Sequence, residues 1–329
     1  PARIAGGATG MSRWADDDRT QAALQQLAAF ATADEPLAPY TTYKVGGAAA
    51  VFASPRNDEE LLQVARAVAD TGLPTLIVGR GSNLLVADHG FHGIAISLAA
   101  MAEWIEFHGT EVHAGSAVAL PVLARRCVAA GLAGFEWAVG VPGSVGGAIR
   151  MNAGGHGSDI AACLIGVHAL DLRTARHGWL DASQLGLHFR GSALADHQVV
   201  LDARLQLREV DVATGEAALS EIVRWRRENQ PGGQNAGSVF VNPIPGELPA
   251  AVLVDRFGLR GFRIGGAHVS DKHSNFIQAT EGALAADVRA VMEHVRATVL
   301  EHTGFALRSE VKLVGFDDDP PATGAGVAL

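Results

Sequence analysis

Two glycine-rich segments of the chain contain the residue types best suited to binding a phosphorylated ligand. The longer one runs from Gly140 to Gly157 and has seven glycines among its eighteen residues. Glycine leaves peptide N–H groups uncovered and adopts backbone angles that other residues avoid, so such a run can surround phosphate oxygens with donors. It has neither the Gly-Lys-Ser/Thr ending of a Walker loop nor a G-x-G-x-x-G pattern that opens a helix. We therefore expect a large phosphorylated cofactor here, the alternative being a structural turn, the commoner role of isolated glycines.

The second segment is a short loop that follows an apolar stretch. It consists of Gly79, Arg80, Gly81, Ser82 and Asn83. Two glycines, a guanidinium and small polar side chains offer the close backbone approach and the several donors that a pyrophosphate needs. Alone, this loop would be a weak signal and an ordinary turn would explain it. Two such loops in one chain suggest one extended ligand that is held at both ends.

The overall composition is that of a folded, acidic chain. Its 329 residues suffice for two or three domains, with 48% hydrophobic and 19% charged residues. The net charge of −9 argues against nucleic acid or an anionic membrane as the main partner. The sequence has no apolar run of about eighteen residues and no signal-peptide pattern, so we expect a cytoplasmic protein.

The cysteines and histidines do not form a recognisable metal motif. Cys127 and Cys163 are the only cysteines, and they belong to neither a C-x-x-C pair nor a Cys/His array. We therefore predict no metal site and no disulfide framework. The thirteen histidines, among them His156 and His273, are scattered, which favours surface or hydrogen-bonding roles.

Hydrophobic periodicity predicts an α+β protein around the two loops. Residues 35–208 are expected to form one unit that divides near residue 100, residues 209–305 a separate α/β domain, and residues 306–316 a closing strand. Residues 1–18 and 317–329 have the composition of disordered ends. The expected strands cover residues 45–54, 75–78, 93–98, 111–114, 164–172, 199–207 and 310–315, and the expected helices cover residues 58–70, 120–130, 216–229 and 284–301.

Eight short motifs occur in the order that is found in one enzyme family. They are Thr42–Gly47, Gly79–Leu85, Gly140–Gly147, Met151–Gly154, Phe189–Ser192, Gly237–Pro243, Ile264–Ser270 and Glu310–Val311. With these motifs, the chain resembles UDP-N-acetylenolpyruvoylglucosamine reductase over roughly residues 35–316. Each motif alone is weak, but their shared order makes the match specific. The short segment between Pro243 and Gly261 is similar to the form of the family that lacks a substrate-covering insertion.

The resemblance implies a flavoenzyme of cell-wall synthesis. Its members hold FAD noncovalently, take electrons from NADPH and reduce UDP-N-acetylglucosamine enolpyruvate, a nucleotide sugar, to UDP-N-acetylmuramate. The implied fold is a two-part FAD-binding module of the vanillyl-alcohol-oxidase type, here residues 35–208, followed by an α/β substrate-binding domain. By motif position, the residues expected to hold FAD are Gly79, Arg80, Gly81, Ser82, Asn83, Leu84, Gly140, Pro142, Gly143, Ser144, Gly146, Gly147, Asn152, Ala153 and Gly154.

The same resemblance assigns three catalytic residues. Arg190 would bind the carboxylate of the enolpyruvyl group and stabilise the negative charge that develops after hydride transfer, because a guanidinium can donate two parallel hydrogen bonds. Ser238 would give the proton to the resulting carbanion, and Glu310 would share a proton or orient the carboxylate with its pKa raised. From spacing alone, a turn serine, a surface salt bridge and a solvated strand end would explain these residues. Because the motifs occur in the family's order, the resemblance favours the catalytic roles over these structural ones.

Four further residues are expected to contact the substrate or the nicotinamide cofactor, namely Asn242, Arg224, Lys272 and His273. For Arg224 and the neighbouring arginines of its helix, a solvated helix face is the alternative, and an ordinary loop is the alternative for Lys272 and His273. The chain also departs from the family in two places. Phe189 stands where many relatives have tyrosine, and Val241 stands where lysine is frequent.

Two other functions compete with the reductase. An FAD oxidase or dehydrogenase of alcohols would expect a histidine for covalent flavin attachment and would not need Arg190, Ser238 and Glu310 together. A catalytically silent flavin-binding or nucleotide-sugar-binding protein would have no use for the trio either. The sequence therefore favours the reductase over both.

Overall fold

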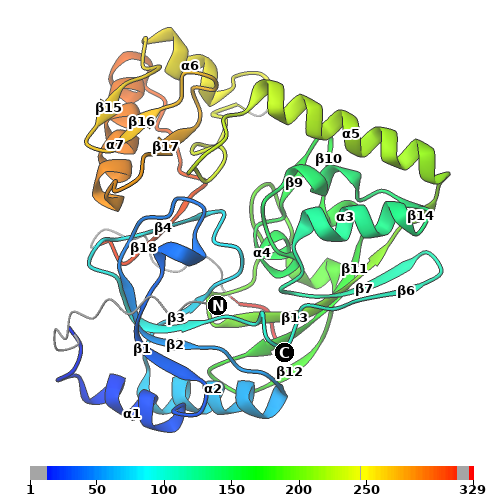
Figure 1. Cartoon of the computed structure of the whole chain (residues 1–329), viewed down its shortest axis with the longest axis vertical. Coiled ribbons are helices and arrows are strands. Elements are labelled where there is room, and N and C mark those ends of the chain that lie inside the picture. The colour runs from blue at the N-terminus through cyan, green and yellow to red at the C-terminus, as the bar shows by residue number, and fades with distance from the viewer. Residues whose placement is uncertain (1–12, 245, 317–325) are drawn as a thin grey trace.

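The computed structural model describes residues 13–244, 246–316 and 326–329. They form three α+β units, of which two lie side by side in the lower part of Figure 1 and the third lies above them. Among the described helices, none has the length and apolar character that a membrane crossing requires. The expectation of disorder for residues 1–12 falls outside the described residues.

The first unit is a four-stranded sheet with two helices on one face. The sheet has the order β1-β2-β5-β3, formed by Ala31–Pro36, Ala48–Ala53, Phe91–Ile96 and Thr75–Ile77. Strand β1 pairs antiparallel with β2, whereas the other neighbours are parallel. Helices α1 (Asp18–Gln26) and α2 (Asp58–Thr71) lie together beneath the sheet and share one apolar core with β2 and β5 (Figure 1).

The ends of α2 follow from its sequence. Asn57 caps the helix by accepting a hydrogen bond from the Glu60 N–H, and Gly72 ends it with a left-handed φ of +63°. Leu61, Val64 and Val68 form the buried face. The structure therefore confirms the helix that periodicity predicts for residues 58–70.

The second unit is a five-stranded antiparallel sheet with the order β12-β11-β13-β7-β6. Its strands are His177–Asp181, Leu164–Asp171, Gln198–Gln206, Glu111–Gly115 and Ile105–His108, and helices α3 (Leu120–Ala129) and α4 (Val145–Arg150) pack on it. The change from the first sheet to the second falls between β5 and β6. The smaller elements of this unit are β8 (Leu132–Ala133), β9 (Gly154–Gly155), β10 (Ser158–Asp159), β14 (Arg208–Glu209), and the 3₁₀ turns η2 (Glu136–Gly140), η3 (Ile160–Ala162) and η4 (Ala182–Leu185).

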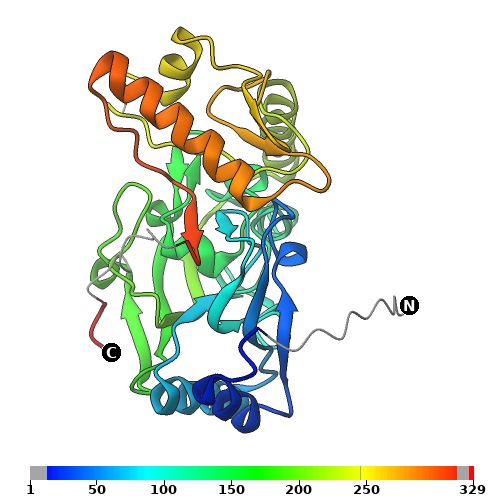
Figure 2. The same cartoon turned by 90° about the vertical axis from the view of Figure 1, so that its left-hand side faces the viewer.

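The third unit packs a small sheet against a long helix. Its strands β15 (Arg263–Ile264), β16 (Ala267–Val269) and β17 (Ile277–Ala279) surround one core with α6 (Ala250–Arg256) and α7 (Ala285–Thr303). The chain then returns to the first unit, where β18 (Lys312–Val314) pairs in parallel with β4 (Leu84–Val86), as Figure 2 shows in red. The predicted closing strand is present but shorter than residues 310–315.

Helix α5 (Val212–Asn229) corrects the predicted domain boundary. Residues 209–305 were expected to form the third unit, but Leu219 and Ile222 of α5 pack on the core of the second unit. After α5, the first residue in the core of the third unit is Ala236, and Tyr43, Val45 and Leu85 of the first unit belong to the same core. The division therefore lies at the end of α5, because the partner of an amphipathic helix is set by tertiary packing and not by its place in the sequence.

Both ends of the chain also differ from the prediction. Residues 13–17 form a turn in which Asp17 caps α1, and α1 and β1 belong to the first unit, which therefore begins before residue 35. The 3₁₀ turn η1 (Ala38–Tyr40) follows β1. At the other end, residues 317–325 lie outside the described residues. Residues 326–329 are described, and Val327 exchanges two hydrogen bonds with the side chain of Gln198, so the predicted disordered tail is wrong for these four residues.

Candidate active site

The loop between β3 and β4 keeps its backbone uncovered. Gly81 has φ +56°, and a Cβ added there would lie 2.1 Å from the carbonyl oxygen of Tyr40. Only glycine tolerates both the left-handed angle and this close approach. Within the described residues, the consecutive peptide N–H groups of residues 79–83 have no acceptor. The loop therefore offers an unbroken run of donors to a ligand.

The second glycine-rich loop meets the first one. A Cβ on Gly79 would lie 2.5 Å from Oγ of Ser144, and a Cβ on Gly143 would lie 3.6 Å from Oγ of Ser82. In the part of the chain that the structure describes, the N–H groups of Ser144 and Gly147 also have no acceptor. The two loops thus approach each other through their glycines and two small serine side chains, and both carry peptide N–H groups without an acceptor among the described residues. This arrangement fits the pyrophosphate of a dinucleotide.

The other predicted cofactor residues lie on these loops or at their ends, namely Gly140, Pro142, Gly146, Ala153, Gly154 and Leu84. Gly146 has a packing role, because a Cβ there would lie 2.9 Å from Cβ of Ser116, whose carbonyl oxygen accepts the Gly146 N–H. Arg80 is exposed, and no hydrogen bond or ion pair with another described residue engages its guanidinium. Its side chain is available to a phosphate.

Arg190 lies on a tight loop that Asn152 holds in place. Asn152 is buried and donates from Nδ2 to the carbonyl oxygen of His188 and to Oδ2 of Asp159, at 3.2 Å each. His188 and Gly191 exchange two backbone hydrogen bonds across Arg190, which has φ +58°. The amide hydrogens of Asn152 are therefore used within the protein, and its place in the cofactor site stays a prediction. What the contacts support is a role in positioning the arginine loop.

Arg190 and Glu310 form an ion pair although 120 residues separate them. Nε of Arg190 donates to Oε2 of Glu310 at 3.1 Å, and Nη2 donates to the carbonyl oxygen of Gly154 at 3.4 Å. The side chain of Glu310 is 15% exposed and that of Arg190 is 28% exposed. Burial raises the pKa of Glu310, and the positive charges of Arg190 and Arg308 oppose that rise. The carboxyl group is thus easier to protonate than an ordinary glutamate.

The backbone of Glu310 is attached to two other predicted site segments. Its carbonyl oxygen accepts from Nδ2 of Asn83 at 2.9 Å, and its N–H donates to the carbonyl oxygen of Val239 at 2.8 Å. The N–H of Lys312 donates in turn to the carbonyl oxygen of Asn83. Glu310 therefore joins the first glycine loop to the strand-like segment that begins at Ser238.

Ser238 lies in an extended segment whose position is fixed by Asn275. Gly237 has φ +76°, and after it the N–H of Val239 donates to the carbonyl oxygen of Asn275 while the N–H of Phe240 donates to its Oδ1. Nδ2 of the same asparagine returns a hydrogen bond to the carbonyl oxygen of Phe240. Sequence reasoning missed Asn275, because it lies outside the eight motifs and its burial is visible only in the structure. Ser238 itself is half-buried, beside the residue that pairs with Glu310.

Comparison with known proteins identifies the family. Residues 229–314 match the C-terminal domain of UDP-N-acetylenolpyruvoylglucosamine reductase, and residues 49–176 match the FAD binding domain family. The reductase of Heliobacterium modesticaldum is 41% identical over 85% of this chain and 90% of its own length, and that of Bacillus subtilis is 37% identical over 86% and 93%. The chain belongs to the UDP-N-acetylenolpyruvoylglucosamine reductase family.

A solved member of the reductase family has the same fold. The crystal structure of the enzyme from Thermus caldophilus superposes with a TM-score of 0.74 at 32% identity, covering 85% of this chain and 97% of that one. The predicted architecture of a two-part FAD-binding module followed by an α/β domain is thereby confirmed.

Of the arginines in α5, the structure brings Arg226 and not Arg224 to the glycine-rich loop. Cδ of Arg226 would lie 2.8 Å from a Cβ on Gly140, and burial lowers the pKa of its guanidinium. Arg224 is exposed, half a turn away from Ile222, which packs inward. The geometry therefore does not support the choice of Arg224, and Arg226 is the better placed cation.

The remaining predicted substrate residues have structural contacts in this state. Lys272 donates from Nζ to the carbonyl oxygen of Arg227, so it links the third unit to the C-terminal end of α5. Oδ1 of Asn242 accepts the Ala250 N–H at the start of α6. His273 packs edge-on against Phe276, and burial lowers the pKa of its imidazole. Their contact with substrate stays a prediction.

The two departures from the family have different consequences. Phe189 is exposed, and its ring centroid lies 4.9 Å from the guanidinium carbon of Arg190, so the ring supports the arginine through a cation–π contact without a hydroxyl. Val241 is buried, and its N–H donates to the carbonyl oxygen of Arg308. Its aliphatic side chain provides no cation at this position.

Proposed function

We propose that this protein reduces UDP-N-acetylglucosamine enolpyruvate to UDP-N-acetylmuramate with electrons from NADPH, passed through bound FAD, in the synthesis of peptidoglycan precursors. The observation that carries the proposal is the Arg190–Glu310 pair at 3.1 Å, attached through Asn83 to the first glycine loop. Ser238 supports the proposal as well, because it precedes Val239, whose carbonyl oxygen accepts the Glu310 N–H.

The two glycine loops would hold FAD. The free N–H groups of residues 79–83 and those of Ser144 and Gly147 suit its pyrophosphate oxygens, and the exposed side chain of Arg80 can add a positive charge. Once reduced by NADPH, FAD held there would supply a hydride to the methylene carbon of the enolpyruvyl group.

The chain's own residues deal with the charge and the proton. Arg190 keeps three N–H groups beyond those that bond Glu310 and Gly154, and these can bind the substrate carboxylate, into which the negative charge spreads. Ser238 donates its proton to the carbon next to that carboxylate, which completes the saturated lactyl ether. Glu310, whose pKa burial raises, can stay protonated beside a second carboxylate and supply a hydrogen bond to it.

The partner that this site suits is a small nucleotide sugar, and we assign the reaction to the cytoplasm, with neither nucleic acid nor a membrane as partner. The acidic balance of the chain supports this assignment, since a net charge of −9 disfavours both kinds of anionic surface. Cell fractionation with an antibody against the chain tests the location. Recovery with the membrane fraction after a salt wash would contradict it.

A titration of the yellow holoenzyme tests the chemistry. NADPH should bleach the flavin absorbance, and UDP-N-acetylglucosamine enolpyruvate should restore it in one-to-one proportion. A flavoprotein that ignores this substrate but oxidises alcohols would instead support the oxidase alternative. Failure of NADPH to bleach the flavin would support a catalytically silent binding protein.

A further inference from the structure

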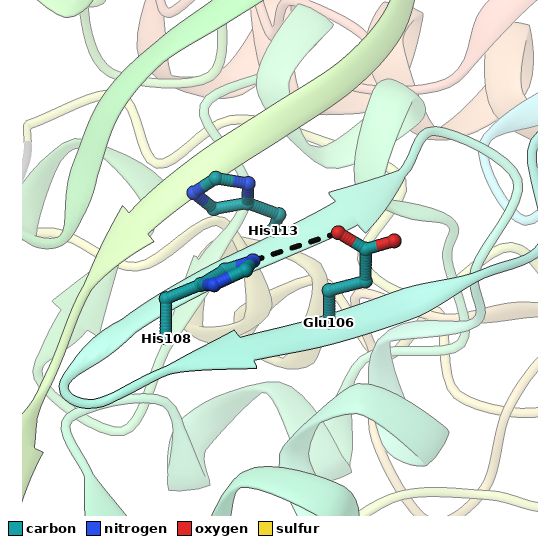
Figure 3. A group of neighbouring side chains, drawn as sticks. All are labelled: Glu106, His108 and His113. Atoms are coloured by element: carbon teal, nitrogen blue, oxygen red, sulfur yellow. Dashed lines mark ion pairs between the residues drawn. The ribbon is translucent and has the colours of Figure 1, made fainter.

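The outer edge of the five-stranded sheet carries a group of metal-ligating side chains that the proposed reduction does not use. Glu106 and His108 lie on the edge strand β6, and His113 lies on the neighbouring strand β7. One potential ligand atom from each residue lies within 4.8 Å of the other two. Figure 3 shows the three side chains gathered on the same side of the hairpin. The hairpin lies on the opposite side of Figure 1 from β4 and β18, so the group is separate from the candidate active site.

The pairing register explains why these side chains converge. Glu106 is paired directly with His113, and His108 is paired with Glu111. Because side chains two apart on a strand share a face, all four project from the same side of the ribbon. Val112, which lies between Glu111 and His113 on β7, is fully buried and packs in the core of the second unit. The sequence shows no metal motif here, because the three residues lie at alternate positions on two paired strands and not at the spacing of known metal-binding helices or loops.

Glu111 is hydrogen-bonded to the imidazole of His113. Its Oε1 lies 2.5 Å from Nε2 of His113, which leaves Nδ1 of that ring for another partner. A carboxylate that holds the distal nitrogen of a ligating histidine fixes the ring orientation and makes the ligating nitrogen more basic. Arg204, with Nη1 at 3.9 Å from the same Glu111 oxygen, balances the charge of that carboxylate. Glu111 is therefore a supporting residue, and Glu106 remains the anionic ligand.

We propose that Glu106, His108 and His113 bind a divalent transition-metal ion of the zinc class. Two imidazoles and one carboxylate match the ligand preference of Zn²⁺ and its neighbours, whereas Ca²⁺ and Mg²⁺ prefer oxygen alone. Metal–ligand bonds of about 2.1 Å bring ligand atoms to roughly 3 to 3.5 Å of one another. Nε2 of His108 and Oε2 of Glu106 already lie 3.5 Å apart. The other atoms reach that spacing by side-chain rotation, since Glu106 and His108 are 62% and 55% exposed.

Isothermal titration of the untagged, metal-free holoenzyme with ZnCl₂ tests the proposal. One site is expected, and His108→Gln and His113→Gln should each weaken it at least tenfold. Glu106→Gln should weaken it as well while keeping the size of the side chain. The matched control is His177→Gln, which removes an exposed histidine from the opposite edge strand of the same sheet and should leave the affinity unchanged.

A second measurement distinguishes this site from adventitious binding to other histidines. The electron paramagnetic resonance spectrum of one equivalent of Cu²⁺ should show coupling to two nitrogen ligands, and that signal should disappear in His108→Gln but persist in His177→Gln. Wild-type zinc affinity in both His108→Gln and His113→Gln, or equal loss in the control, would overturn the proposal. Flavin absorbance and melting temperature identify variants that fail to fold. Bleaching by NADPH is read separately, so failure of the metal site leaves the proposed reduction standing.

Discussion

Asp88 is the clearest case of a residue that should act on the reaction without touching the reactants. It lies in the turn after β4, and its two carboxylate oxygens accept the N–H groups of Ala285 and Ala286 at 2.8 and 2.9 Å. These are the first two residues of α7, in another unit of the protein. Leu284, which precedes them, offers no side-chain oxygen. Asp88 therefore caps the long helix of the third unit from the FAD-binding module.

The turn that carries Asp88 is itself held tightly. A Cβ on Gly47 would lie 2.4 Å from the carbonyl oxygen of Asp88, and a Cβ on Gly315 would lie 2.3 Å from that of Gly90. Both glycines belong to segments that adjoin the site, one in the Thr42–Gly47 motif and one directly after β18. Asp88 is therefore one of several contacts that hold the third unit in place, beside the Lys272–Arg227 hydrogen bond and the packing of Tyr43, Val45 and Leu85 in the core of the third unit.

The expected cost of Asp88→Ala can be estimated from its two contacts. Loss of a helix cap costs about 1 kcal/mol, within a range of roughly 0.5 to 2. Loss of a negative charge at the N-terminus of α7 adds about 0.3 to 1 kcal/mol. The sum, about 1 to 3 kcal/mol, loosens the docked arrangement by roughly fivefold to a hundredfold, since about 1.4 kcal/mol is tenfold. The variant should therefore retain FAD, melt at a lower temperature and show a raised KM for the enolpyruvyl substrate.

Asp211→Ala is the matched control. Asp211 caps α5 by accepting the Thr214 N–H at 3.1 Å, and α5 packs on the second unit. Its loss should lower the melting temperature by a similar amount and leave KM near the wild-type value. Steady-state kinetics and hydrogen exchange of the Ala285 and Ala286 amides provide the comparison. An unchanged KM in Asp88→Ala, or the same rise in both variants, would refute the reasoning.

Four further outcomes are expected. Ser238→Ala should leave reduction of FAD by NADPH near the wild-type rate and slow reoxidation by the enolpyruvyl substrate by about a hundredfold or more, as rapid-mixing absorbance would report; equal loss of both steps would contradict a proton-donor role. Gly81→Ala would place a methyl group 2.1 Å from a carbonyl oxygen at a positive φ, so the purified protein should contain little FAD, and a full flavin complement would count against the cradle. Burial raises the pKa of Cys127 and of Cys163 to about 12, so neither thiol should react with a disulfide reagent at pH 8 before unfolding. Because the unfolded chain loses these protons first, the free energy of unfolding should fall as pH rises from about 9 towards 12, and denaturant titrations that show no such fall would contradict the burial.

The sequence predicted those elements whose apolar faces are long and regular. Helix α2, strand β11 and strand β13 lie within one or two residues of their predicted bounds, because each buries a clear stripe or an alternating row. Among the elements that it missed, α4, α6, β16 and β17 are buried but short, whereas α1 and β1 bury little. Helix α1 buries only Thr20 and Ala23, and β1 buries none of its six residues. Their sequences are mostly polar, and they are stable because of the sheet and helix against which they pack.

The sequence indicated individual residues of the candidate site but not the hydrogen bonds that join them. Ordered motifs indicated Arg190 and Glu310, yet only folding shows that Asn83 bonds the backbone of one of them and Asn152 positions the loop of the other. The choice between Arg224 and Arg226 depended on the rotational phase of α5 against its neighbours. That phase is a tertiary property, because a helix with a modest apolar face can present more than one side to a core.

The Arg190–Glu310 pair determines how binding of the proposed substrate would change the pKa of Glu310. Before substrate arrives, Arg190 offsets part of the penalty of burying Glu310 as an anion. A substrate carboxylate bound to the same guanidinium brings a second negative charge next to Glu310, and like charges at such distances disfavour two anions. Binding therefore pushes the pKa of Glu310 in the direction in which burial already moves it. In the proposed reaction, substrate binding therefore favours the protonated form of Glu310, which would place a neutral acid and a cation beside the charge that hydride transfer creates.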